Sequence, residues 1–307
     1  MTVIEAIQKS ADFLGKKGVE SPRLQTELLL AHLLKLPRMK LFLNFERVLS
    51  QVETDALREL IKRRSRREPL QHIVGSTSFC GYEIAVNRHA IVPRPETELL
   101  AEHGWDFLVT RHASPVTAID FGTGTGCIAI ALAAKSPLAK ITALEISADA
   151  LALAKENAAR NRVADRIEFL QCDGFASLTE RWGERPREPK SNVQDGSPGV
   201  SPHQFDLIIS NPPYIPSAEI ATLQPEVRDF DPRAALDGGA DGLDLYRKLA
   251  AEAKPFLKPD GKIMLEFGDG QAEAVKSIFE NEKWIVEAVK EDYSHRARIL
   301  IARHKHF

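Results

Sequence analysis

The sequence predicts an α/β protein with a mostly parallel sheet, preceded by a small helical domain. Two observations carry this prediction. Apolar residues recur at helical spacing from the first residue to about residue 68. Beyond residue 95, short apolar segments alternate with helical ones, which is typical of parallel strands joined by crossover helices. We therefore expect a helical domain over 1–75, a β-hairpin linker over 76–95 and an α/β domain over 96–307.

The helical domain carries clear helix-start signals. Ser21 and Pro22 predict an N-cap followed by a proline in the first turn. Ser50 and Glu53 have the spacing of a capping box. The basic run over 62–67 closes that helix, and we interpret it as a solvated helix C-terminus, which the helix dipole favours, rather than as a binding patch.

The predicted sheet has seven strands. Pro69 ends the helical pattern, and the stretch over 71–92 turns β-like, which fits a short hairpin. The strands expected in the main sheet are VTAID (116–120), KITALEI (140–146), RIEFLQ (166–171), FDLIIS (205–210), GKIMLEF (261–267), WIVEAV (284–289) and ARILIA (297–302). Residues 183–204 are rich in Pro, Ser, Gly and charge, and we expect a flexible surface insertion there.

Composition narrows the functional classes. The formal charge is −2 over 307 residues, so the sequence has no overall basic footprint for nucleic acid. The three cysteines, Cys80, Cys127 and Cys172, lie far apart and show neither metal-ligand spacing nor a disulfide framework. We find no signal peptide and no apolar run long enough to span a bilayer, so we expect a cytoplasmic protein without a membrane partner.

A glycine-rich turn follows the first strand of the predicted sheet. Residues 120–126, DFGTGTG, lead from that strand into a helix, where glycines let the backbone approach a ligand closely. The spacing is G-x-G-x-G, not the G-x-G-x-x-G of dinucleotide sites. The motif favours a nucleotide-like ligand, although a tight packing turn would also account for it.

Acidic residues end the next two predicted strands. Glu145 lies about 20 residues after the glycine turn, where a carboxylate can accept both ribose hydroxyls. Asp173 ends the third strand and can accept from an exocyclic amine of adenine, with Phe175 near enough to stack. Either acid alone could be a helix cap. Together with the glycine turn they predict a nucleoside site at the carboxyl edge of the sheet.

The fourth strand of this domain runs into SNPPYIP, residues 210–216. Neither proline has an N–H to donate, so the backbone cannot continue a ladder. The residue before a proline is also restricted to extended geometry. We therefore expect a rigid turn that holds the Asn211 amide in one place. S-adenosylmethionine fits this combination better than NAD, because its sulfonium and amino-acid tail replace the pyrophosphate that needs the longer glycine motif.

These motifs together resemble the HemK/PrmC family. Asn-Pro-Pro-Tyr after the fourth strand is similar to methyltransferases that act on adenine amino groups or glutamine side chains. PRPETE at 93–98, REPLQHIVGSTSFCGYEIAV before it and DPRAALDGGADGLDLYRKL after the Asn motif extend the resemblance over nearly the whole chain. The resemblance implies a Rossmann-like class I methyltransferase that methylates the glutamine of the GGQ motif in class-1 peptide chain release factors.

The resemblance also implies site residues by position. Asn211 and the carbonyl of Pro212 would bind the substrate amide, with Pro213 and Tyr214 beside them; Asn211, Pro212 and Tyr214 would be catalytic. The helical domain would recognise the substrate protein. Neither a metal ion nor a nucleic-acid substrate is expected, and we expect a monomer. The residues implied for S-adenosylmethionine are Arg94, Thr97, Glu98, Asp120, Gly122, Thr123, Gly124, Thr125, Gly126, Glu145, Asp173, Gly174, Phe175 and Asn211.

The chemistry explains why an acceptor clamp is needed. An amide nitrogen is a poor nucleophile because its lone pair is delocalised into the carbonyl. Two acceptors, the Asn211 side-chain oxygen and a backbone carbonyl, would hold both N–H hydrogens and align the nitrogen with the sulfonium methyl. The same acceptors would stabilise the positive charge that develops on nitrogen.

Two alternatives remain open from the residues alone. An adenine-N6 methyltransferase acting on DNA or RNA would use the same clamp on a flipped base. The near-neutral charge and the absence of a large basic target-reading domain disfavour it. A non-enzymatic S-adenosylmethionine-binding module is disfavoured because it has no use for the clamp.

The chain departs from the family pattern at three places. Glu145 stands where an Asp is usual, and the 183–204 insertion is longer than usual. The stretch from His295 to Ala297 lacks a glycine that the family pattern leads us to expect.

Overall fold

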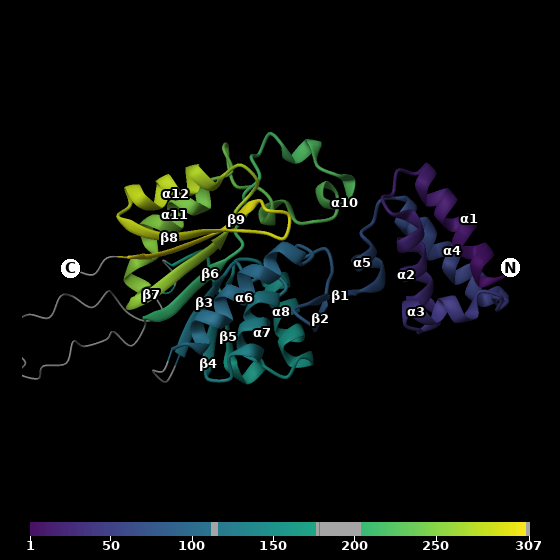
Figure 1. The fold of residues 1–307 in the computed structure, drawn as a ribbon, viewed down its shortest axis with the longest axis horizontal. Coiled ribbons are helices and arrows are strands. Elements are labelled where there is room, and N and C mark those ends of the chain that lie inside the picture. Colours follow the sequence, from purple (N-terminus) through teal and green to yellow (C-terminus); the bar gives the residue numbers. More distant parts are fainter. Residues whose placement is uncertain (112–115, 176–177, 179–203, 305–307) are drawn as a thin grey trace, which may run out of the picture. The chain divides into compact units, whose positions relative to one another are not determined.

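The structure is a computed structural model that describes residues 1–111, 116–175, 178 and 204–304 (Figure 1). Most of the predicted insertion over 183–204 lies outside the described residues. The chain divides into two compact units. The first, here called the helical unit, comprises residues 1–77, 86–88 and 222–231; the second, the sheet unit, comprises 78–85, 89–221 and 232–307. The helical unit therefore takes in a segment, 222–231, that we had placed in the α/β domain.

The helical unit has its own apolar core. Its helices are α1 (Val3–Lys16), α2 (Pro22–Leu34), α3 (Arg38–Leu41), the 3₁₀ turn η1 (Phe42–Asn44), α4 (Gln51–Ser65), α5 (Leu70–Val74) and the single turn α10 (Pro225–Arg228). The core is formed by fully or nearly fully buried side chains such as Ile7, Leu29 and Leu57. The capping box of Ser50 and Glu53 is confirmed, with both reciprocal hydrogen bonds present. The predicted cap at Ser21 is wrong in one respect: Ser21 occupies the N-cap position, but its backbone is left-handed (φ 48°) and its side chain makes no capping bond.

Part of the basic run over 62–67 is structural. Arg64 is only 3% exposed and donates a hydrogen bond to the Glu226 carboxylate at 2.6 Å. Arg67 donates to both oxygens of the same carboxylate, at 2.7 and 2.6 Å. Burial opposes ionisation of Glu226, but the hydrogen bonds from Arg67 and Arg64 outweigh it and lower the pKa of Glu226. Our interpretation of the run as a solvated helix end is therefore wrong for Arg64 and Arg67, which hold the 222–231 segment on the helical unit.

The sheet unit contains one large sheet in the order β5-β4-β3-β6-β7-β9-β8 and a separate hairpin, β1-β2. All seven predicted strands and the hairpin are confirmed. Every pairing from β5 to β7 is parallel, and β9 runs antiparallel to both of its neighbours. The strands are β1 (Ser76–Phe79), β2 (Tyr82–Ala85), β3 (Val116–Phe121), β4 (Ala139–Glu145), β5 (Ile167–Gln171), β6 (Phe205–Ser210), β7 (Leu257–Glu266), β8 (Trp284–Glu291) and β9 (Ala297–His304).

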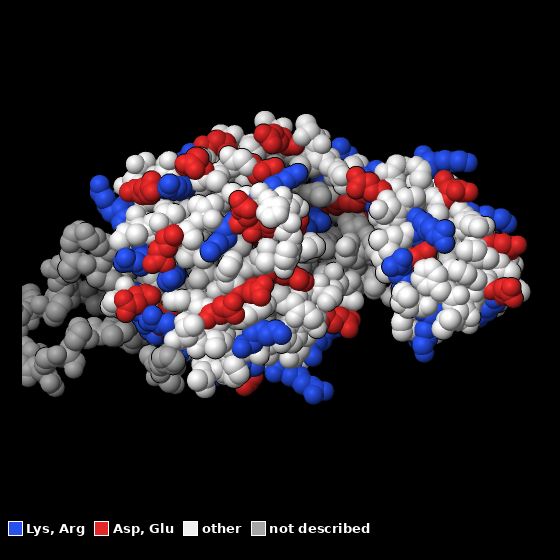
Figure 2. All heavy atoms as spheres, viewed as in Figure 1, with Lys and Arg blue, Asp and Glu red and all other residues white. Residues whose placement is uncertain are grey.

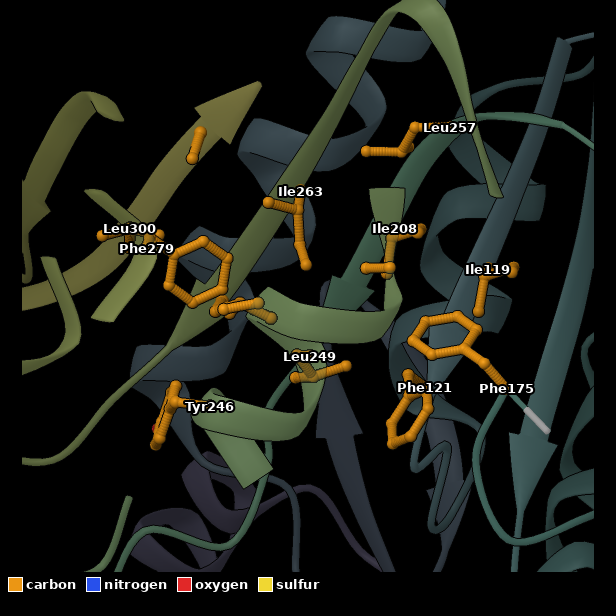
Figure 3. Packing of buried hydrophobic residues seen from close by; sticks show 14 of the residues in the cluster. Ile119, Phe121, Phe175, Ile208, Tyr246, Leu249, Leu257, Ile263, Phe279 and Leu300 are labelled. Atoms are coloured by element: carbon orange, nitrogen blue, oxygen red, sulfur yellow. The ribbon is translucent and has the colours of Figure 1, made fainter. Parts of the chain in front are cut away.

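Helices cover the sheet and bury its apolar strands (Figure 1). Helix α7 packs on β4, α8 on β5, and α6 on β6 and β7; α12 packs on β8 and β9, with α11 beside it. Figure 3 shows the core on the α11 side, where Ile208, Ile263 and Leu249 meet. The helices of this unit are α6 (Pro95–Val109), α7 (Cys127–Lys135), α8 (Ala148–Arg160), α11 (Asp244–Glu252) and α12 (Ala272–Asn281), with 3₁₀ turns η2 (Ala164–Arg166), η4 (Arg233–Ala235) and η5 (Lys254–Phe256) and, at its border with the helical unit, η3 (Ile220–Thr222).

The turn between β8 and β9 explains one departure from the family pattern. Asp292 accepts hydrogen bonds from the backbone N–H groups of Ser294 and Arg296, which shapes the turn. His295 lies in this turn with φ at 58°, in the left-handed region that favours glycine. The glycine we expected near this position therefore has a physical reason, and His295 takes up the same backbone at some cost.

Acidic and basic side chains are interspersed on the face of the molecule drawn in Figure 2. Within the part of the chain that the structure describes, none of the helices combines the length and the hydrophobicity of a transmembrane span.

Candidate active site

The carboxyl ends of β3, β4, β5 and β6 meet at one edge of the sheet. The parallel register aligns Phe121 with Leu144, and Glu145 with Gln171. The loops after these strands line a cavity of about 300 Å³ within the sheet unit, at the small end of ordinary ligand sites. Its lining residues are His89, Ala90, Ile91, Phe121, Gly122, Gly124, Leu144, Glu145, Ile146, Ser147, Ala150, Cys172, Asp173, Gly174, Asn211, Pro212, Pro213, Pro232, Ala234, Ala235, Leu245 and Lys248.

The glycine turn after β3 divides into two parts. Gly122 and Gly124 line the cavity; a Cβ at Gly122 would meet no atom within 4 Å, and one at Gly124 would reach only Ala90, at 3.9 Å. A Cβ at Gly126 would instead lie 3.0 Å from the Cβ of Ala154, in the middle of α8. We expected all three glycines to face the ligand. The third instead allows α7 and α8 to pack closely, and only the first two face the cavity.

The polar residues of the same motif stabilise the loop from the side away from the cavity. Asp120 is fully buried and accepts from the Thr123 hydroxyl at 2.6 Å and from the Ala129 N–H at 3.1 Å. Burial raises the pKa of Asp120 to about 7, although both of those hydrogen bonds lower it. Thr125 is buried as well, and its carbonyl accepts from Asn157. Asp120 and Thr123 shape the loop through their side chains and Thr125 through its backbone carbonyl. None of the three lines the cavity, which corrects their expected contact with the cofactor.

Glu145 is held rigidly at the end of β4. One carboxylate oxygen accepts from the Gly124 N–H at 2.9 Å and the other from the Ser147 N–H at 3.0 Å. A carboxylate oxygen has two lone pairs, so each oxygen retains one for a ligand. Glu145 therefore joins the glycine turn to the β4–α8 turn and presents two fixed acceptors to the cavity, as an acid that binds a diol must.

The end of β5 departs from our expectation. Asp173 and Gly174 line the cavity, and Asp173 pairs with Lys248 of α11 at 3.3 Å. Phe175, which we expected to stack on adenine, is 2% exposed and stacks on Phe256, with ring centroids 4.8 Å apart. Figure 3 shows its ring beside Phe121 in the core. The Phe175 assignment is therefore wrong, because its ring completes the core under the site.

Several lining residues were not predicted as site residues, and two of them, Ile146 and Lys248, bear on the ligand. Ile146 directly follows Glu145 and is 57% exposed despite being apolar. Lys248 reaches the cavity from α11. An exposed isoleucine next to the acid would have been a usable signal, because apolar side chains line the walls of most ligand sites. Lys248 had no local signal, since only the tertiary fold brings α11 to β5.

The Asn211 side chain is hydrogen-bonded to a buried residue of α6. Its amide nitrogen donates to the Thr97 hydroxyl at 3.0 Å, and Thr97, on α6, is 3% exposed. Asn211 itself lines the cavity. Because the nitrogen is engaged with Thr97, the amide presents its oxygen as an acceptor. Thr97, which we expected at the cofactor, thus acts on the clamp residue instead.

Backbone contacts hold the two prolines and Tyr214. The Tyr214 carbonyl accepts from the Gln271 side chain at 2.9 Å, and Gln271 in turn accepts from the Gly268 N–H at 2.8 Å. A Cβ at Gly238 would lie 2.8 Å from the Pro213 carbonyl, so the glycines of DGGADG allow two backbones to approach. Pro212 and Pro213 line the cavity.

The remaining predicted residues lie off the cavity. Burial raises the pKa of Tyr214 to about 12, and its ring packs against the core rather than lining the described cavity. Glu98 accepts from the Cys80 N–H in the β1–β2 turn at 2.9 Å, and Arg94 is the N-cap residue of α6. PRPETE therefore joins α6 to the hairpin and, through Thr97, to Asn211. Within the described residues, no group of three or more His, Cys, Asp or Glu side chains could hold a metal ion.

Comparisons with known proteins agree with this geometry. Residues 5–75 match the PrmC N-terminal domain family, and residues 112–301 match a methyltransferase domain family. A release factor glutamine methyltransferase of Geobacter sulfurreducens is 41% identical over 278 residues, covering 91% of this chain and 88% of the relative. One of Chlorobaculum tepidum is 39% identical over 277 residues, covering 89% and 87%.

A solved structure shows the same fold. SMU.776, whose structure was solved with SAH bound, superimposes with a TM-score of 0.50 at 12% identity, over 74% of this chain and 56% of that one. Together with the PrmC-type N-terminal domain, the glycine turn and Asn-Pro-Pro-Tyr, these matches show that the chain belongs to the release factor glutamine methyltransferase family.

Proposed function

We propose that this protein transfers a methyl group from S-adenosylmethionine to the side-chain amide nitrogen of the GGQ glutamine in class-1 peptide chain release factors. One observation carries the proposal. The Asn211 amide, tied through its nitrogen to Thr97, presents an oxygen acceptor to a cavity that also holds Glu145 and the glycine turn. The names of the relatives in Geobacter and Chlorobaculum support the same substrate.

The cavity suits the cofactor. Gly122 and Gly124 leave open space for the methionine part, because a Cβ at either would meet nothing closer than 3.9 Å. Glu145 would accept from the ribose hydroxyls. Asp173, Gly174 and the exposed Ile146 would bind adenine. When bound there, S-adenosylmethionine supplies an electrophilic sulfonium methyl.

The clamp then acts on the substrate amide. The Asn211 oxygen and the Pro212 carbonyl would accept the two N–H hydrogens and fix the nitrogen in line for attack. The nitrogen lone pair forms the new N–C bond, the C–S bond pair stays with sulfur, and one nitrogen proton is lost to water. Both acceptors stabilise the positive charge on nitrogen before that proton leaves.

We further propose that the helical unit recognises the release factor. A single glutamine side chain offers too little surface to select one protein among many. The helical unit has its own core and carries none of the cavity-lining residues. Residues 222–231 belong to it, yet lie in the chain only eight residues beyond Tyr214. We propose a monomer that acts in the cytoplasm, where release factors work.

The test is a transfer assay with labelled S-adenosylmethionine. The wild-type chain is offered a full-length release factor, the same factor with the GGQ glutamine replaced by alanine, and duplex DNA. We expect label in the first alone. Label in the alanine variant would mean that another residue is modified, and label in DNA but not in protein would establish the adenine alternative.

A further inference from the structure

Glu266 lies immediately behind the clamp. It is the last residue of β7, and the register pairs Ser210 of β6 with Leu265 of β7. One step further along both strands therefore puts Asn211 level with Glu266. Glu266 is 3% exposed, and its backbone carbonyl accepts from the Tyr246 hydroxyl at 2.7 Å, which fixes the strand end. The acid is thus a buried neighbour of the proposed catalytic amide.

Asn211, Thr97 and Glu266 form a chain of hydrogen bonds with one direction. The Thr97 hydroxyl accepts from the Asn211 nitrogen at 3.0 Å and has one hydrogen of its own to donate. The side chains of Thr97 and Asn211 are both hydrogen-bonded to the Glu266 carboxyl. An ionised carboxylate only accepts. The chain therefore starts at the Asn211 N–H groups, ends at Glu266, and leaves the Asn211 oxygen for the cavity.

The burial of Glu266 also lowers the stability of the fold. Its second carboxylate oxygen is buried with no hydrogen-bond partner among the described residues. Leaving such an atom unsatisfied costs about 1–3 kcal/mol or more for a charged group. Burial raises the pKa of Glu266 to about 7, while the Thr97 hydrogen bond, the charge of Arg298 and the Asn211 hydrogen bond lower it. A residue that destabilises the fold in this way is expected to serve the site.

We propose that Glu266 is a positioning residue that, through Thr97, holds the Asn211 amide with its oxygen toward the substrate. This inference rests on the proposed transfer to an amide nitrogen. A carboxyl that has gained a proton can donate to Thr97 and reverse the chain. Thr97 would then donate to the Asn211 oxygen, and the amide would present N–H groups to the substrate nitrogen, which itself offers only N–H groups.

Several charged and titratable groups surround Glu266. Arg298 of β9 and Glu96 of α6 act on it directly, and Tyr214 and Tyr246 each experience its charge. Arg94 acts on the neighbouring Tyr214. Arg298 favours the ionised carboxylate and Glu96 opposes it. None of these groups donates to the unpartnered oxygen, so the hydrogen bonds from Thr97 and Asn211 are the link between Glu266 and the clamp.

The test uses isosteric pairs in the full-length protein. Thr97→Val removes the hydroxyl at constant shape, and Thr97→Ser restores it. With release factor saturating, Thr97→Val should lower the single-turnover rate about 10- to 100-fold, by analogy with removing the group that orients a metal-ligating side chain. Thr97→Ser should return to within a few-fold of wild type. Calorimetry should give the same affinity for S-adenosylhomocysteine in both variants, and steady-state kinetics the same KM for release factor.

The second arm is the pH profile. The wild-type rate should rise with pH as Glu266 ionises, and Glu266→Gln should lose that titration. A wild-type profile in Glu266→Gln, or equal rates in Thr97→Val and Thr97→Ser, would overturn the positioning role. Failure of the wild type to label the release factor would instead refute the proposed function, so the two failures are distinguishable.

Discussion

The backbone N–H of Gly124 donates a hydrogen bond to the carboxylate of Glu145 across the mouth of the cavity, at 2.9 Å. The other carboxylate oxygen accepts from Ser147. One acid thus fixes two loops and two ligand acceptors at once. Removing it should disturb cofactor binding through both effects.

We therefore expect Glu145→Ala to weaken binding of S-adenosylhomocysteine by about 10- to 100-fold, since charge-assisted hydrogen bonds contribute roughly 1.5–3 kcal/mol. Isothermal titration calorimetry measures this directly. Glu156→Ala is the matched control, because Glu156 lies on α8 in an exposed pair with Arg160, away from the cavity. Equal affinities for the two variants would place the ribose elsewhere.

Gly122 and Gly126 should respond differently to alanine. Both have positive φ, 72° and 81°, so the backbone strain is similar. Only at Gly126 does the added Cβ meet another atom closely, Ala154 at 3.0 Å. Overpacking of this kind costs about 1–3 kcal/mol. Urea unfolding should show Gly126→Ala to be the less stable variant by that amount, and equal stabilities would contradict the packing role.

Glu266 should make the protein less stable as the pH rises. Its pKa is raised from 4.5 to about 7 in the folded state. Between these values the folded chain binds a proton that the unfolded chain has lost, so the free energy of unfolding falls with rising pH, by about 3 kcal/mol in total. Below pH 4.5 both states are protonated and the penalty is absent.

Glu266→Gln removes this titration. Between about pH 4.5 and 7, the free energy of unfolding of Glu266→Gln should increase relative to that of the wild type. Above that range the difference between the two proteins should be constant. Asp120, buried with a raised pKa of about 7, changes stability in the same direction but equally in both proteins. Urea titrations at several pH values give the comparison, and parallel curves for the two proteins would show that Glu266 is ionised throughout.

The β8–β9 turn offers a stabilising substitution. His295 has φ at 58° and is exposed, and its ring lies 3.4 Å from the Glu291 carboxylate. Glycine adopts this backbone without the penalty of about 1–2 kcal/mol that a Cβ carries there. His295→Gly should raise the melting temperature by a few degrees. Ser294→Gly, at the adjacent residue, which lacks a positive φ, should not; a lower melting temperature for His295→Gly would refute the strain argument.

Glu226 allows the helical unit to be tested without truncation. A chain beginning near Ser76 would lose Arg64 and Arg67 and leave Glu226 unpaired. Glu226→Ala should instead destabilise the helical unit by about 3–5 kcal/mol, because it leaves the buried Arg64 without its charged partner. It should raise the KM for release factor while the affinity for S-adenosylhomocysteine is unchanged. Asp229→Ala, which removes an exposed pair with Arg228, is the control.

The sequence predicted the elements of this protein better than their contacts. Alternating apolar segments located all seven strands, and the ends of β3, β4, β5 and β6 located the cavity. What could not be predicted depended on side chains from distant elements. Phe175 was assigned to the ligand because it follows Asp173. Its ring instead stacks in the core on Phe256, which lies more than 80 residues later in the chain.

The same limit applies to the clamp and to the basic run. Thr97 and Glu266 lie more than 100 and 50 residues from Asn211. The pairing of β6 with β7 and the packing of α6 on both strands bring the three residues together. Arg64 looked like one of several solvated cations, because nothing local shows that Glu226 lies opposite it. Periodicity reports which residues are buried, but not which polar partner a buried residue meets.

The measurement that tests the account most directly is methyl transfer by Asn211→Ala. Single-turnover transfer to a release factor is measured beside calorimetric binding of S-adenosylhomocysteine, in the variant and in the wild type. The account predicts unchanged binding and a loss of transfer on the order of 10²-fold or more, as when a preorganised hydrogen-bonding group is removed from a transition state. Transfer within a few-fold of wild type would contradict the assignment of Asn211 as the acceptor that holds the glutamine amide.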